Sequence, residues 1–229
     1  DIGLCDGIAA EYADDCRLLR FSHSFENDIL AAARNMAKRY KCHAGHNQML
    51  EQYALSIFDT ARKFHGMGAR ERLLLQIAVT LHGCGKFISI RNSNESSYNL
   101  IMSTEIIGLS HLEREIIANA VRYNIRDFDY DTIQLETQIG EDGSGNLNRS
   151  AIIILIAKLT AILRLANSMD KTHKSKLADC RMAIREGELV ITTGYTGDLA
   201  LERASFEQKA DFFEEIFGIR PVLKQKRRA

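Results

Sequence analysis

The sequence predicts a mainly α-helical protein that ends in a small α+β region. Through most of the first 176 residues, apolar side chains recur at intervals of three and four, the spacing of a helix with one buried face. A single proline among 229 residues leaves room for long helices. Near the C-terminus, two short apolar segments flank Glu186-Gly187-Glu188, which indicates a β-hairpin.

Composition limits the classes of function. A chain of 229 residues can form one large domain or two modest ones, and its formal charge of zero confines any polyanion site to a local patch. The 5 cysteines are odd in number and never spaced as Cys-x-x-Cys, which fits a reducing cytoplasm better than a disulfide framework. The apolar run 152–166 contains Lys158 and Arg164, so we expect a buried helix and not a membrane span.

The periodic segments place the expected helices in order. Four helices are expected at 24–40, with a cap at Ser24, and at 46–58, 69–82 and 150–169. Two more begin at Tyr98 and at a capping box formed by Ser110 and Glu113. Residues 93–97 are expected to form a polar turn. Residues 127–149, acidic and then rich in Gly and Asn, are expected to form a mobile loop.

The C-terminal region has a different pattern. Residues 182–185 and 189–193 are the expected hairpin strands, and 221–223 can add a third strand. Between them lies a helix with one apolar face formed by Phe206, Ala210, Phe213 and Phe217. The last residues, 224–228, form a basic tail that we expect to be solvated.

Two histidines on apolar helical faces are the first candidates for chemistry. His46 shares the buried face of its helix, and His82 ends a core helix that Gly83 and Gly85 interrupt at once. The glycines are most simply read as a helix C-terminal stop. A buried histidine is more often a hydrogen-bonded core residue than a ligand, so a structural role stays open for both.

Several short motifs, in order, resemble one family. They are Phe58-Asp59, Leu81-His82 with Gly85-Lys86-Phe87-Ile88, Ser97-Tyr98, Val121-Arg122-Tyr123, and Leu163-Arg-Leu-Ala-Asn-Ser-Met-Asp170. Together they resemble the C-terminal half of the exopolyphosphatase/guanosine pentaphosphate phosphatase (Ppx/GppA) family. The opening segment 3–7 also looks like the end of that family's actin-like phosphatase domain.

The resemblance implies a domain plan. Residues 1–20 are expected to be the tail of a preceding actin-like phosphatase domain, 21–176 an HD-like helical domain, and 177–229 a small α+β domain. The family's catalytic loops belong to the actin-like domain, so we expect no catalytic residue here and no hydrolysis of polyphosphate by this segment alone. Implied partners are inorganic polyphosphate or guanosine pentaphosphate, the actin-like domain and a second copy in a homodimer, with no membrane.

The resemblance also implies a degenerate HD metal site. Such a site holds a divalent metal between imidazoles and carboxylates, which neutralise its charge. His46 and His82 stand at matching positions, but Gly83 and Asn167 stand where the family pattern has carboxylates. We therefore expect no metal and no cofactor in this segment, although a divalent ion such as magnesium can serve the full-length enzyme.

A cationic groove is the expected polyphosphate site. Its candidates are Lys86, Arg91, Arg122, Arg126, Arg164, Lys171, His173 and Lys174. Arginine gives bidentate phosphate contacts and lysine a mobile point charge. Arg164 is the strongest single candidate, because a charge within an apolar helix must find a partner or a wet cavity. The alternative for each residue is an ordinary solvated charge paired with Asp or Glu.

Three functions remain open from the sequence. The first is an accessory region that binds a polyanionic substrate and supports dimerisation of an exopolyphosphatase-like enzyme. The second is an active HD-type metal phosphohydrolase that uses His46 and His82 with replacement ligands. The third is a pure interaction module. The sequence does not distinguish polyphosphate from guanosine pentaphosphate.

Overall fold

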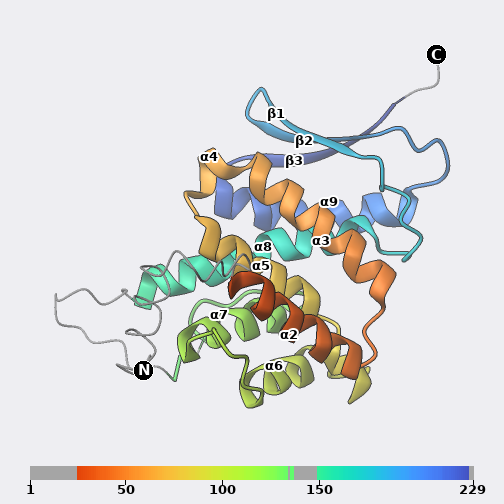
Figure 1. Ribbon diagram of the computed structural model, residues 1–229. Helices are drawn as coiled ribbons and strands as arrows, with labels where there is room; N and C mark the ends of the chain where they lie inside the picture. The colour runs from red at the N-terminus through yellow and green to blue at the C-terminus, as the bar shows by residue number, and fades with distance from the viewer. Residues whose placement is uncertain (1–24, 134, 137–148, 227–229) are drawn as a thin grey trace, which may run out of the picture.

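A computed structural model describes residues 25–133, 135, 136 and 149–226 (Figure 1). The elements are α2 (Phe25–Arg39), α3 (Ala44–Thr60), α4 (Arg62–His65), α5 (Ala69–Leu81), the 3-10 helix η1 (Cys84–Phe87), α6 (Ser93–Ser103), α7 (His111–Arg122), α8 (Arg149–Met169), β1 (Arg181–Arg185), β2 (Glu188–Thr193), α9 (Ala200–Phe217) and β3 (Arg220–Gln225). The expected class, mainly α with a small α+β part, is confirmed. The cap at Ser24 and the segment 1–20 lie outside the described residues.

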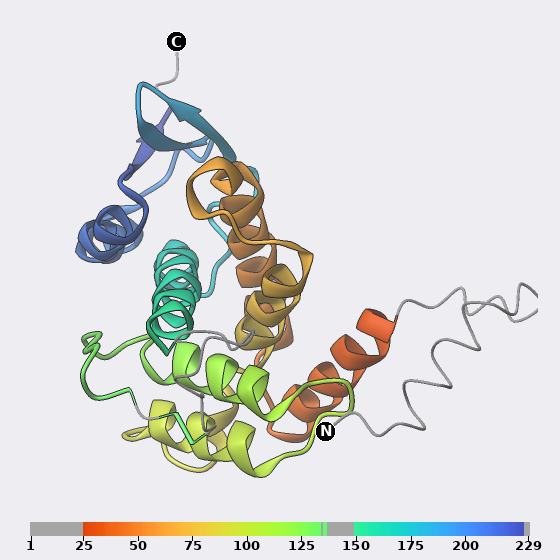
Figure 2. The ribbon, with the colours of Figure 1, turned by 90° about the vertical axis from the view of Figure 1, so that its left-hand side faces the viewer.

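Helix α8 is the central element of the bundle. It packs against α3, α7 and α9, and Figure 2 shows it between α9 on one side and the α3 and α5 pair on the other. By length and composition alone α8 could cross a membrane, but 72% of its apolar window is buried inside the fold. That burial agrees with the expected core helix at 150–169.

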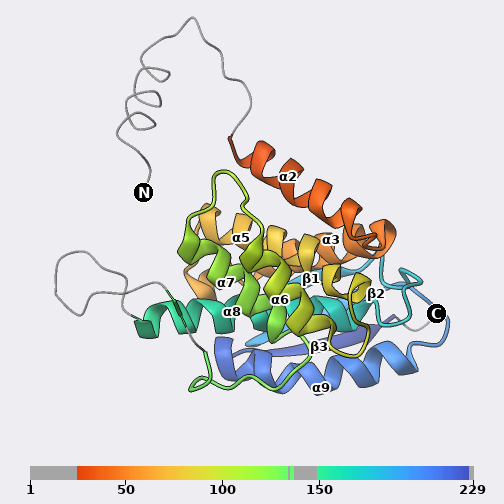
Figure 3. The ribbon, with the colours of Figure 1, turned by 90° about the horizontal axis from the view of Figure 1, so that it is seen from below.

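The remaining helices bury the faces that their spacing indicated. In α3 the buried residues include His46, Leu50, Tyr53 and Ile57. The capping box of α7 forms as expected: Glu113 N donates to Ser110 Oγ at 3.2 Å, and Ser110 N donates to a Glu113 carboxylate oxygen at 2.8 Å. Helix α2 packs on α5 at the margin of the bundle away from α9 (Figure 3).

Two local predictions differ from the structure. Residues 93–97 form the first turns of α6 and not a polar turn, because Ser97 Oγ accepts a hydrogen bond from Gly85 N at 2.8 Å and thereby anchors the helix. The short helix α4 was not predicted; it ends at His65, and the following Gly66 caps it with a φ of 65° before α5 begins. Of the expected loop 127–149, the described residues between Asp127 and Ile133 form no helix or strand.

Gly83 and Gly85 have different roles. Neither has a positive φ in the structure, so they do not form the left-handed stop that the sequence indicated. A Cβ on Gly85 would lie 1.9 Å from Ser93 O and 2.4 Å from Ser97 N, so only glycine lets α6 approach here. A Cβ on Gly83 would meet only Cys42 Sγ, at an ordinary 3.8 Å.

The C-terminal sheet has the order β1-β2-β3. β1 pairs antiparallel with β2 through the expected turn, in which Glu186 and Gly187 have φ of 52° and 78°, the signs that a two-residue hairpin turn needs. β3 follows the crossover helix α9 and pairs parallel with β2, where Pro221 lies opposite Leu189. Proline is tolerated in β3 because that strand is at the edge of the sheet.

The helical bundle and the sheet share one hydrophobic core. Ile29 and Leu81 in the bundle belong to the same cluster of buried side chains as Leu189, Phe213 and Leu223. Leu177, at the expected domain boundary, is fully buried. The shared core does not mark a boundary at 176/177, so a division of the chain there remains a prediction.

Candidate functional site

His46 forms a buried pair with Asp170 at the end of the bundle where α3 begins and α8 ends. His46 Nδ1 lies 2.8 Å from Asp170 Oδ2, and the two side chains are 3% and 1% exposed. Asp170 Oδ1 also accepts a hydrogen bond from Ser175 N at 2.8 Å. Because a carboxylate can only accept, His46 carries its proton on Nδ1. Within the described residues, the buried Nε2 of His46 has no hydrogen-bond partner.

His82 faces the same interior from the end of α5. Its ring centroid is 5.5 Å from that of His46, and its Nδ1 donates to Val79 O at 2.7 Å. Burial lowers the pKa of His82 to about 4, and the nearby His46, Lys86 and His173 act in the same direction. His82 is therefore neutral at physiological pH, with a lone pair on Nε2.

His173 completes this cluster from the turn after α8. The His173 ring stacks on the His46 ring with a centroid distance of 3.8 Å and an interplanar angle of 12°. The centroid of the His43 ring lies 5.7 Å from that of His173. Burial lowers the pKa of His173, and His46 and Lys86 lower it further. The parallel His46 and His173 rings resemble a packing contact, since their in-plane lone pairs do not converge on one point.

Two of the four expected HD positions are histidines here, and the carboxylate lies elsewhere. Gly83 follows His82 without a side chain, and the half-buried Asn167 lies in the last turn of α8. Sequence reasoning missed Asp170, which orients His46 from behind. The sign that could have found it is its own motif, 163–170, which ends in that aspartate.

A magnesium ion does not fit these residues. Magnesium takes oxygen ligands in octahedral geometry. The cluster offers imidazole nitrogens, and both oxygens of Asp170 are occupied by His46 and Ser175. The arrangement is that of an orienting carboxylate behind a histidine.

Four exposed lysines lie within four positions of these residues in the chain. We call the lysines, together with His43, His46, His82, His173 and Asp170, the histidine end. The lysines are Lys41, Lys86, Lys171 and Lys174. Lys41 Nζ is 5.9 Å from the centre of the ring of Phe87, the residue after Lys86. In the described part of the chain, none of the four lysines forms an ion pair.

Three predicted arginines gather elsewhere, between α6, α7 and α8, and we call them the arginine side: Arg122, Arg126 and Arg164. Arg122 makes a two-point contact with Glu95 at 2.7 and 2.9 Å and lies 4.8 Å above the Tyr98 ring. Arg126 contacts the same carboxylate at 3.1 Å. One glutamate thus partly neutralises two cations.

Arg164 is committed to the interior. It is 6% exposed, donates through Nε to Tyr123 O at 2.8 Å and through a terminal nitrogen to Arg126 O, and lies 4.6 Å from the centre of the Phe212 ring. Burial lowers its pKa, and Asp127 opposes that effect. The partner that the sequence required for this charge is the backbone after α7, together with an aromatic face.

Seven of the eight predicted cations therefore belong to one of these two groups. Lys86, Lys171, His173 and Lys174 belong to the histidine end, and the exposed Arg91 precedes α6. Lys209 on α9 was not predicted; burial lowers its pKa, and Arg164 and Lys171 lower it further. Phosphate binding by any of these residues remains a prediction.

Comparison with protein families gives one match. The family model for the Ppx/GppA phosphatase, domain III, matches residues 30–210. The chain belongs to the Ppx/GppA phosphatase family. The match extends from α2 into α9 and covers every residue of the histidine end and of the arginine side. No curated protein matches the chain.

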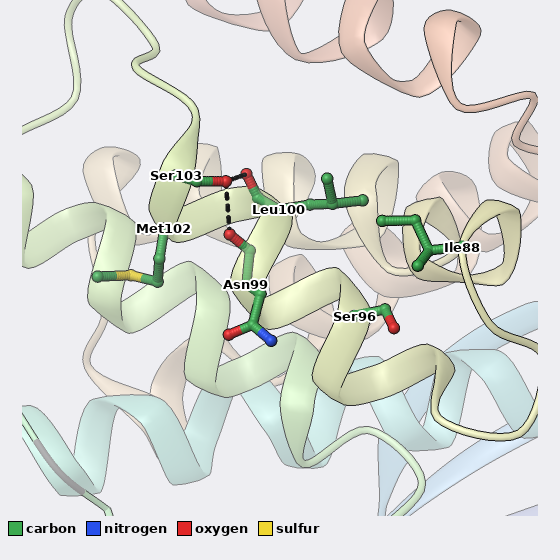
Figure 4. Close-up of a pocket in the computed structure, with 6 residues that line it drawn as sticks. All are labelled: Ile88, Ser96, Asn99, Leu100, Met102 and Ser103. Atoms are coloured by element: carbon green, nitrogen blue, oxygen red, sulfur yellow. Dashed lines mark hydrogen bonds between the residues drawn. The ribbon is translucent and has the colours of Figure 1, made fainter.

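Two other features of this Ppx/GppA domain III have the outward form of binding sites. A hollow of about 530 Å³ between the end of η1 and α6 is lined by Ile88, Ser96, Asn99, Leu100, Met102 and Ser103 (Figure 4). None of these side chains is charged, so the hollow has no group that would hold a phosphate. It contains none of the predicted site residues.

The second feature is a group of three potential metal ligands, two on α7 and the third at residue 136. The ligand atoms of His111, Glu115 and Glu136 lie within 4.8 Å of one another. His111 Nε2 is 3.7 Å from a Glu136 carboxylate oxygen, and Glu136 N donates to Glu115 Oε1. His111 and Glu136 side chains are 45% and 69% exposed, so the contacts fasten residue 136 onto α7 without any need for an ion.

Proposed function

We propose that this region is an accessory, polyanion-binding part of an exopolyphosphatase-like phosphatase, and that linear polyphosphate binds at the histidine end. The observation that carries the proposal is the state of the lysines there. Lys41, Lys86, Lys171 and Lys174 are exposed and have no ion-pair partner in the described ranges, while Asp170 is buried and occupied. A polyanion that meets free clustered cations gains by releasing its counterions.

The same comparison argues against the arginine side as the main site. Glu95 already contacts Arg122 and Arg126, and its carboxylate would repel an incoming phosphate. Arg164 would have to leave two carbonyl oxygens and an aromatic ring to reach a ligand. We therefore assign Arg164 a structural role and the phosphate contacts to the lysines.

The test compares two double variants that each remove two charges. Calorimetric titration of the chain with long-chain polyphosphate at two salt concentrations should give an affinity about tenfold lower for Lys86→Gln with Lys174→Gln. The matched pair Arg122→Gln with Arg126→Gln should change the affinity by about twofold or less, because those charges are already paired. Guanosine pentaphosphate is titrated in parallel to define the preferred ligand.

Two outcomes would contradict the proposal. One is polyphosphate affinity that does not depend on salt, since counterion release then plays no part. The other is a larger loss with the arginine pair than with the lysine pair. Complete absence of binding would favour the interaction module.

The proposal includes a degenerate HD site and a homodimer. Support for the first is that Gly83 and Asn167 supply no carboxylate and that Asp170 orients His46. Support for the second is the family itself, together with the exposed apolar side chains of Phe87, Ile88 and Ile90. Sedimentation equilibrium would contradict the dimer by giving a monomer mass at every concentration. We place the protein in a reducing cytoplasm on its cysteine content.

A further inference from the structure

Two cysteine thiols are in direct contact beside the histidine end. Cys42 lies in the connection between α2 and α3, next to His43, and Cys84 begins η1, directly after Gly83. Their Sγ atoms are 3.4 Å apart and share a hydrogen bond, although the residues are 42 positions apart in the chain. The other described cysteine, Cys180, lies just before β1.

The two thiols differ in exposure and acidity. Cys84 is fully buried, while Cys42 is half-buried and reachable from solvent. The hydrogen bond with Cys84 lowers the pKa of the Cys42 thiol and Lys86 lowers it further, although burial opposes them. The same hydrogen bond and burial raise the pKa of Cys84. The Cys42 sulfur is thus the better nucleophile, and the buried Cys84 sulfur is in contact with it.

We propose that Cys42 and Cys84 form a reversible dithiol-disulfide pair that hydroperoxides oxidise. The Cys42 thiolate attacks one peroxide oxygen, the O–O bond breaks, and the other oxygen leaves as water or an alcohol after taking a proton. The Cys42 sulfenic acid is then attacked by Cys84 sulfur. The S–S bond forms, and the sulfenic oxygen leaves as water with the Cys84 proton. Two thiols lose two electrons in total, and one peroxide gains them.

The geometry around the pair permits this step. A disulfide has an S–S distance of about 2 Å, so the two sulfurs must approach by a little over 1 Å. Gly83 places no side chain beside Cys42, and a Cβ there would already contact its sulfur at 3.8 Å. The half-exposed Cys42 belongs to a connection between two helices, outside the regular helical hydrogen bonding of α2 and α3.

The disulfide would join the two segments that carry the histidine end. It would link the residue before His43 to the residue after Gly83, and so fix Lys86 relative to Lys41. Cross-linking residues about 40 positions apart restricts the unfolded chain and should raise the melting temperature by roughly 5 °C or more. The oxidised form should therefore be the more heat-stable form.

The test uses the full chain treated with hydrogen peroxide, followed by alkylation of the remaining thiols and peptide mapping without reductant. The expected product is a peptide pair joined at Cys42 and Cys84, lost on addition of dithiothreitol. Cys180→Ser is the matched control and should give the same product. Cys42→Ser should prevent it, while Cys84→Ala should leave a Cys42 sulfenic acid that dimedone traps.

A further variant tests the role of the neighbouring lysine. Lys86→Gln should slow the oxidation of Cys42 by roughly threefold at neutral pH, because the thiolate loses a nearby positive charge. The proposal is overturned if the parent, shown by circular dichroism to be folded, gives no Cys42–Cys84 peptide at full loss of Cys42 thiol. It is also overturned if Cys180 is oxidised before Cys42. Cys42→Ser keeps the test valid should Cys84→Ala fail to fold, because Cys42 is only half-buried.

Discussion

The histidine end and the arginine side both carry cationic side chains, but those of the arginine side have protein partners and the lysines of the histidine end have no ion-pair partner among the described residues. On the arginine side, one carboxylate and two backbone carbonyls occupy Arg122, Arg126 and Arg164. At the histidine end, the lysines are exposed and the one buried carboxylate, Asp170, is turned inward to His46. The difference teaches that the number of basic residues near a motif does not locate an anion site. Their remaining partners do.

The largest expected effect is the loss of stability when the buried His46–Asp170 pair of the histidine end is broken. Asp170→Ala should lower the free energy of unfolding by about 3 kcal/mol, because His46 Nδ1 and Ser175 N lose their acceptor in a buried place. Urea unfolding at pH 7 measures it. Asp179→Ala, at an exposed position in the same connection, is the control and should cost about 0.5 kcal/mol or less. Equal losses would show that the pair has no special role.

The second effect concerns pH and His82. Folded His82 has a pKa of about 4, against 6.5 for the free side chain. Between those values the unfolded state binds more protons, so stability is highest above pH 6.5 and falls as the pH drops toward 4. From pH 7 to pH 5 the parent should lose about 2 kcal/mol more than His82→Gln, measured by urea unfolding.

The control for His82 is His111→Gln, which alters an exposed histidine on α7. It should leave the slope of stability against pH close to that of the parent. A parent slope that persists unchanged in His82→Gln would mean that another group, such as the buried His65, causes it; burial lowers the pKa of that residue too.

A smaller effect tests whether the histidine end can be turned into a metal site. The backbone at Gly83 accepts a side chain, since its φ is −94° and a Cβ has space. Gly83→Asp with Asn167→Asp should raise manganese affinity at least roughly tenfold, because two carboxylates join the imidazoles of His46 and His82. Gly83→Ser with Asn167→Ser is the uncharged control. Stoichiometric manganese in the purified parent would contradict the degenerate site.

The smallest expected effect comes from a substitution that frees the arginines of the arginine side from their carboxylate partner. Glu95→Gln removes the carboxylate that occupies Arg122 and Arg126 and should raise polyphosphate affinity by about threefold at low salt. Calorimetry measures it, with Glu105→Gln, an exposed residue before α7, as the control. If affinity does not rise, the arginines are too far from the bound polyanion to help.

The sequence by itself determined the class of fold, most helices, the hairpin and the family. Apolar spacing was sufficient for these because each helix buries one face, and the run at 150–169, which is apolar on most sides, was expected to be central. The positions of His46 and His82 on buried faces also followed from spacing. The tautomer of His46, which Asp170 sets, and the neutral form of His82, which burial favours, did not follow from spacing.

Tertiary structure alone decided which groups meet. Asp170 reaches His46 across 124 positions, Cys84 reaches Cys42 across 42, and Ser97 reaches Gly85 across 12, and the last contact makes a helix start where polar residues suggested a turn. None of these pairs is periodic, so local spacing carries no trace of them. Whether a cation is free is likewise a property of the fold, because the carbonyl groups that hold Arg164 belong to every residue type and leave no mark in the sequence.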